Sequence, residues 1–81
     1  MKAKVNRTLD CLGLYCPEPV FRTRMELDNI RMGEILDVLA DDPAAEADIR
    51  SLVKRLEQEI VEVIRDKNTV RIRIKKVKNS Q

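Results

Sequence analysis

Two cysteines are the residues of this chain best suited to covalent chemistry. Cys16 opens the sequence Cys16-Pro17-Glu18-Pro19, and Cys11 lies shortly before it. Proline is tolerated in the first turn of a helix, so this sequence predicts a helix start with Cys16 at or near the N-cap. Unpaired amides and the helix dipole favour a thiolate there, whereas the nearby Glu18 carboxylate disfavours it. We expect a modest net lowering of the pKa of the Cys16 thiol.

The chain contains no histidine. This excludes a Cys-His nucleophilic pair and any His-ligated metal site within one chain, and two cysteines alone cannot form a closed zinc site. Without a base, Cys16 is better suited to receiving a group and handing it on than to turning over a small substrate. The alternative is that Cys16 caps the helix and has no chemical role.

The elements that would position Cys16 follow from the hydrophobic pattern. Residues 5–11 predict a strand with Cys11 facing inward, and Gly13 allows a positive φ in the turn at 12–15. Residues 16–30 predict a helix that Met32-Gly33 ends. Its buried stripe is expected to consist of Val20, Leu27 and Ile30.

The second half of the chain repeats this strand–helix order and then adds two strands. Residues 34–40 predict a strand, and Asp41-Asp42-Pro43 predicts an N-cap acid followed by proline at the first helical position. One apolar arc of the next helix comprises Ile49, Leu52, Val53, Leu56 and Ile60. Strands are predicted over 60–64 and 70–77, with a turn at 66–68.

The fold class predicted is therefore α+β, a two-layer α/β sandwich of order βαβαββ. A four-stranded mixed sheet carries two helices on one face, and its other face is polar, with Thr8, Asp37, Glu62, Arg71 and Arg73. The 81 residues predict a single domain, 1–81, with an ordered core of about 5–77. No apolar run approaches the ~18 residues of a membrane span. The N-terminus is polar, so we expect a cytoplasmic protein with reduced thiols.

Six basic residues and no acid lie between positions 67 and 78: Lys67, Arg71, Arg73, Lys75, Lys76 and Lys78. Such a run can mark an anionic partner such as RNA. It is more often the solvated face and frayed end of an edge strand, where lysines discourage aggregation. We favour the edge strand.

One motif resembles a known family. The sequence Asp10-x-Leu12-Gly13-Leu14-x-Cys16-Pro17-Glu18-Pro19 is similar to the signature of the TusA/SirA-like sulfur carriers, and Gly33-Glu34 and Asp41-Asp42-Pro43-Ala44 match at the expected places. The similarity extends from Thr8 to about Ile74. Within this span the family is variable at Cys11, so no family role transfers to that residue, and Gln58 stands where many relatives carry a histidine in the second helix.

The resemblance implies a carrier that takes persulfide sulfur on Cys16 and needs no cofactor. The supporting residues would be Asp10, Gly13, Pro17, Glu18 and Pro19. The donor would be a cysteine desulfurase or a rhodanese-like protein. A downstream acceptor protein would use the sulfur in tRNA thiolation, molybdenum-cofactor assembly or related sulfur metabolism. Such a chain is a sulfur-relay protein rather than a stand-alone enzyme.

A partner must also dock beside the sulfur. Phe21 and Met25 lie one turn apart on the predicted first helix, away from its buried stripe, and Arg22 and Arg24 flank them. We expect these four residues to form a docking patch. The alternative is that Phe21 and Met25 pack against the second helix and widen the core.

Two other functions compete with the carrier. Cys11 and Cys16 could form a dithiol redox switch, although an inward-facing Cys11 favours a core residue. An RNA-binding or regulatory module is the other, but one Phe, one Tyr and no Trp offer little for base stacking. We therefore expect a monomer that binds proteins, with no direct nucleic-acid or membrane binding.

Overall fold

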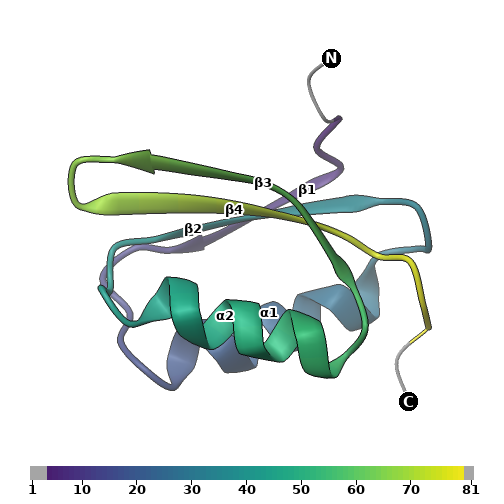
Figure 1. Ribbon diagram of the computed structural model, residues 1–81, viewed down its shortest axis with the longest axis horizontal. Coiled ribbons are helices and arrows are strands. Elements are labelled where there is room, and N and C mark those ends of the chain that lie inside the picture. The colour runs from purple at the N-terminus through teal and green to yellow at the C-terminus, as the bar shows by residue number, and fades with distance from the viewer. Residues whose placement is uncertain (1–3, 80–81) are drawn as a thin grey trace.

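The computed structural model describes residues 4–79. Its elements are β1 (Arg7–Cys11), α1 (Glu18–Asn29), β2 (Ile35–Ala40), α2 (Ala45–Arg55), β3 (Glu59–Asp66) and β4 (Thr69–Lys75). The strands lie in the order β1-β2-β4-β3, with β1 parallel to β2 and the other pairs antiparallel. Both helices cover one face of this sheet (Figure 1), so the predicted α+β two-layer sandwich is confirmed. No helix within residues 4–79 has the length and apolar character to cross a membrane.

The two central strands build the core: β4 alternates between buried and partly buried residues, and β2 is buried at nearly every position. Val38 of β2 pairs with Ile72 of β4, and both side chains are fully buried beneath the helices. Their strand neighbours on the same face continue the layer, because side chains alternate between the two faces of a sheet. The core members are Leu36, Val38 and Ala40 of β2, Val70, Ile72 and Ile74 of β4, and Ile49, Leu52 and Val53 of α2.

The first helix differs from the prediction in its start and its buried face. Its N-cap is Pro17, so Cys16 precedes the helix rather than capping it. The buried face of α1 consists of Pro19, Thr23 and Leu27, with Ile30 just beyond the helix, whereas Val20 is only partly buried. A pattern that scores only apolar residues does not predict that Thr23 is buried.

The second helix is shorter than its apolar arc suggested. Ala44 is its N-cap and makes no side-chain cap hydrogen bond, so neither the predicted acidic N-cap nor the predicted Pro43 at the first helical position is found. The helix ends at Arg55 because Glu57 takes a positive φ of 59°. Ile60 therefore belongs to β3 and reaches the core from the sheet.

The basic last strand is central, not an edge. β4 lies between β2 and β3, and β1 and β3 form the edges, so our edge-strand prediction was wrong. Arg71 and Arg73 of β4 form ion pairs with Asp37, a carboxylate on the polar face that is only 1% exposed. Arg73 also donates to Glu62 of β3 at 2.8 Å. These arginines neutralise acids of the same sheet face, which leaves less free positive charge for RNA.

The side chains of Gln58 and Lys76 form hydrogen bonds that hold the chain in place just after β4. The Gln58 amide oxygen accepts hydrogen bonds from the Val77 and Lys78 backbone N–H groups at 2.8 and 3.1 Å, and its Nε2 donates to the Lys78 carbonyl at 2.7 Å. The buried Lys76 donates from Nζ to the Ile30 carbonyl at 2.9 Å, at the C-terminus of α1. A cation there satisfies a free carbonyl and complements the negative end of the helix dipole.

Lys76→Met should lower the free energy of unfolding by about 1–2 kcal/mol, because the Ile30 carbonyl would stay buried without its donor. Urea denaturation followed by circular dichroism measures the change. The neighbouring Lys75→Met is the control, since Lys75 follows the strand alternation onto the opposite sheet face. Equal losses in the two variants would contradict this role of Lys76.

Candidate functional site

The two cysteines occupy opposite environments. Cys16 is exposed on the connection between β1 and α1, whereas Cys11 ends β1 with a side chain that is 0% exposed. Because β1 and β2 are parallel neighbours, the connections that follow them leave the same edge of the sheet. The loop that carries Cys16 therefore lies beside the turn that starts α2.

Two carboxylates from that turn hold the Cys16 loop by its backbone. Asp41 Oδ1 accepts a hydrogen bond from the Gly13 N–H at 3.0 Å, and Asp42 Oδ2 accepts one from the Cys16 N–H at 2.9 Å. The other Asp42 oxygen accepts from the Ala44 N–H at 3.1 Å. The acidic pair that we expected to cap α2 instead bridges two connections of the chain.

The predicted supporting residues have separable roles in this loop. Asp10 Oδ1 accepts the Leu12 N–H at 2.9 Å, and Gly13 has a positive φ of 79°, which a residue with a Cβ adopts only with strain. Pro17 is the N-cap of α1, and Pro19 is buried against the core. Each therefore shapes the backbone that presents Cys16.

Glu18 turns away from the sulfur. Its carboxylate accepts a hydrogen bond from Arg22 Nε at 3.2 Å, one helical turn along α1. It is not among the groups that shift the pKa of Cys16. The local repulsion that we expected between Glu18 and the thiolate is therefore not found.

Acids of α2 and of the turn before it control the thiol instead. A side-chain hydrogen bond to Asp48 is the main cause that raises the pKa of the Cys16 thiol above its ordinary value of 9.0. Partial desolvation and the negative charges of Asp48 and Asp42 act in the same direction. The expected lowering of this pKa was wrong, because Cys16 lies before the N-cap and faces carboxylates from the next helix.

Cys11 is a core residue. Burial is the largest cause of its raised pKa, and it packs in the same cluster as Leu27, Val38 and Ala40. Its thiol lies inside the core, whereas the Cys16 thiol is exposed. This environment disfavours the dithiol switch.

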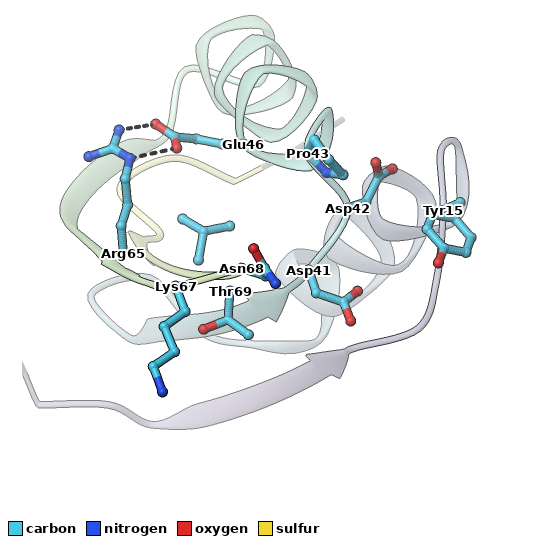
Figure 2. A pocket seen from close by; sticks show the side chains of 10 residues that line it. Tyr15, Asp41, Asp42, Pro43, Glu46, Arg65, Lys67, Asn68 and Thr69 are labelled. Atoms are coloured by element: carbon cyan, nitrogen blue, oxygen red, sulfur yellow. Dashed lines mark hydrogen bonds and ion pairs between the residues drawn. The ribbon is translucent and has the colours of Figure 1, made fainter.

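A polar cleft borders the Cys16 loop, and sequence reasoning missed it (Figure 2). Its volume is about 500 Å³, and Tyr15 and Asp42 stand at one end of it. At the other end Arg65 of β3 makes two hydrogen bonds to Glu46 of α2, one of them from Nε at 3.0 Å. The remaining lining residues are Asp41, Pro43, Lys67, Asn68, Thr69 and Val70. No local sequence motif predicts this cleft, because its lining residues come from three separate connections: β1–α1, β2–α2 and β3–β4.

An apolar groove lies along the outer side of α1. Phe21 and Met25 are 56% and 65% exposed, and they line this groove together with Leu9, Glu18, Arg22 and Glu26. Phe21 and Met25 therefore do not pack against the second helix. Arg24 is separated from them: it lines a different cleft, with Leu52, Arg55 and Leu56. The structure thus joins three of the four predicted docking residues.

No group of three or more His, Cys, Asp or Glu side chains within residues 4–79 is arranged to hold a metal ion.

The origin of the raised thiol pKa gives a direct test. Asp48→Asn should lower the pKa of Cys16, because the amide carries no charge and stabilises the protonated thiol less. The pH dependence of the alkylation rate at Cys16, followed by mass spectrometry, measures that pKa. Glu18→Gln is the control and should leave the pKa unchanged. A lowered pKa in Glu18→Gln but not in Asp48→Asn would show that Glu18 of α1, and not Asp48 of α2, raises the pKa of Cys16.

Comparisons with known proteins agree with this architecture. A model of the family described as sulfurtransferase TusA matches residues 7–76. A protein of Archaeoglobus fulgidus named "Putative sulfur carrier protein" is 61% identical over 56 residues, which cover 69% of this chain and 73% of that protein. The crystal structure of a SirA-like protein from Desulfitobacterium hafniense superposes with a TM-score of 0.78 at 23% identity, covering 89% of this chain and 99% of that one, and supports the fold. The chain belongs to the sulfurtransferase TusA family.

Proposed function

We propose that this chain is a sulfur carrier that accepts persulfide sulfur on Cys16 and relays it to an acceptor protein. The observation that carries the proposal is the exposed Cys16 thiol on a loop tethered by Asp41 and Asp42, in a chain whose other thiol is buried. In the transfer, Cys16 Sγ attacks the terminal sulfur of the donor persulfide, and the donor cysteine leaves with the electrons of the broken S–S bond. No external oxidant or reductant is consumed.

The surroundings of Cys16 favour a relay over an independent enzyme. Carboxylates raise the pKa of its thiol, so most molecules carry a protonated, weakly nucleophilic sulfur at neutral pH. Such a thiol reacts slowly with small molecules in solution. It is suited to transfer inside a complex, where the donor is held against it. The partners we infer are a cysteine desulfurase or a rhodanese-like donor, and an acceptor serving tRNA thiolation, molybdenum-cofactor assembly or related metabolism, in the reducing cytoplasm.

Removing each thiol separately tests the single-cysteine mechanism. Cys16→Ser should abolish uptake of labelled sulfur from a purified cysteine desulfurase, because a hydroxyl cannot hold persulfide sulfur. Cys11→Ala should retain uptake within about twofold and lose roughly 1 kcal/mol of stability as a small core truncation. Mass spectrometry of the intact chain locates the added sulfur, and urea denaturation gives the stability. Loss of uptake in Cys11→Ala, with the fold intact, would contradict the mechanism.

The apolar groove on α1 is the surface that we propose the donor covers during transfer. Phe21 lies one turn into α1, close along the chain to Cys16, and Met25 continues the groove toward Leu9 of the edge strand β1. Exposed aromatic side chains with an adjacent arginine are typical anchors of protein interfaces. Arg22 supplies that arginine, and its ion pair with Glu18 holds it at the groove.

Phe21→Ser should weaken donor binding by about tenfold or more, equivalent to about 1.4 kcal/mol, because the anchor is lost. The melting temperature should hardly change, since the ring is exposed in the free protein. Binding to the desulfurase is measured by calorimetry. Met32→Ser serves as the matched control, because Met32 is also exposed but follows the opposite end of α1. A large loss of stability with unchanged donor affinity would remove the groove from the mechanism.

A further inference from the structure

The apolar groove on α1 borders a free edge of the sheet. β1 is the first strand in the order β1-β2-β4-β3, so within residues 4–79 it pairs on one side only, with β2. The backbone N–H and C=O groups that β1 directs to its other side have no strand partner in this part of the chain. Leu9 connects this edge to the groove, because it lines the groove together with Phe21 and Met25 of α1.

The two edges of the sheet differ in how well they are protected against another strand. β3, the other edge, contains a register shift between Ile60 and Glu62, and such an irregularity bends a strand and hinders further pairing. β1 pairs with β2 through five successive residues, Arg7–Cys11, with no register shift, and it contains no proline. β1 is therefore a short but regular edge to which a further strand can add.

A strand added to β1 would place side chains in the groove. Neighbouring strands lie about 4.8 Å apart, and every second side chain of an added strand points to the face that carries the helices. Leu9 packs against the core from that face and is only partly buried. The groove beside it has a volume of about 380 Å³. A side chain next to Leu9 on an added strand would therefore meet Phe21 and Met25.

The free backbone groups of β1 determine which kind of partner segment fits. A partner that covers Leu9, Phe21 and Met25 also excludes water from the adjoining edge of β1. Buried N–H and C=O groups without a partner cost free energy. A helix would leave the groups of β1 unsatisfied, because its own backbone groups are bonded internally. An extended segment supplies donors and acceptors to the edge and an apolar side chain to the groove.

The groove also leads along β1 towards the loop that carries Cys16. At the start of β1, Arg7 forms an ion pair with Glu26 of α1 at 3.1 Å. At the start of α1, Glu18 and Phe21 line the groove just after the Cys16 loop, which follows the end of β1. α1 therefore runs back along β1, and one end of an added strand lies near the Cys16 loop.

We propose that the sulfur donor adds an extended segment of its chain to the free edge of β1 and places an apolar side chain of that segment in the groove. The inference rests on the proposed carrier function and specifies how the donor occupies the groove. Main-chain hydrogen bonds to β1 hold the segment, and the groove selects its side chain. Because one end of the added strand lies near the Cys16 loop, the same contact brings the donor towards the thiol.

Amide hydrogen exchange in the presence of a purified cysteine desulfurase tests the added strand. The N–H groups along β1 alternate between β2 and the free edge, so every second amide of β1 should exchange fast in the free chain. In the complex these amides should exchange about tenfold more slowly or less, because hydrogen-bonded amides are protected. Mass spectrometry at residue resolution measures the rates. The outward amides of β3 are the control and should keep their rates.

Proline substitutions test the same hydrogen bonds by a second route. Arg7→Pro and Thr8→Pro remove two successive N–H groups, of which one points to β2 and the other to the free edge. The variant that loses only the edge group should keep its melting temperature, because proline is tolerated there. It should bind the desulfurase about tenfold more weakly than the alanine variant of the same position, which keeps its N–H group. If both proline variants unfold, hydrogen exchange decides alone.

The outcomes separate this inference from the proposed carrier function. Slowed exchange confined to α1, in a complex that transfers sulfur, would overturn the added strand and leave the carrier function intact. Equal desulfurase affinity of the folded proline variant and its alanine counterpart would do the same. A wild-type chain that neither binds the desulfurase nor takes up its sulfur would count against the carrier function itself, and with it against the added strand.

Discussion

The candidate site depends on the hydrogen bonds by which Asp41 and Asp42 hold the Cys16 loop. A loop that leaves a five-residue edge strand has few contacts of its own to fix it. Carboxylates that accept backbone N–H groups form charge-assisted bonds, which are stronger than neutral ones. They fix the direction in which Cys16 projects without occupying its side chain. The sulfur stays exposed while the backbone that carries it is anchored to the next structural unit.

Strand pairing determines which residues can serve as those anchors. The parallel β1–β2 pair places two connections at one sheet edge, so Gly13 and Asp41 meet although 28 positions separate them. At the opposite end of α1, Lys76 donates a hydrogen bond to the Ile30 carbonyl. Gln58 accepts a hydrogen bond from the Val77 N–H, just after β4. The end of the molecule that carries Cys16 is thus exposed, and the opposite end is held by hydrogen bonds. The apolar groove of α1 and the polar cleft beside Tyr15 are the two surfaces that we propose for partners.

Local patterns predicted the elements well and the electrostatics poorly. Strict alternation in β4 and the spacing of Leu36, Val38 and Ala40 in β2 identified the core faces, because successive residues of a strand point to opposite faces of the sheet. The central place of β4 was missed, since Arg71 and Arg73 look like solvent-facing charges until Asp37 is known to lie beside them. The prediction of a lowered pKa for Cys16 failed for the same reason. A window around Cys16 contains Glu18, which points elsewhere, and does not contain Asp48.

The raised pKa of Cys16 is consistent with what a carrier must do between partners. A free thiolate would react with oxidants and electrophiles during diffusion, because thiolate character governs both reactions. A thiol kept protonated by Asp48 and Asp42 is protected from them. The same protonation would slow transfer to a donor that meets Cys16 only by diffusion. A complex that holds the donor persulfide against Cys16 offsets the low thiolate fraction, because it raises the effective concentration of the reacting sulfur.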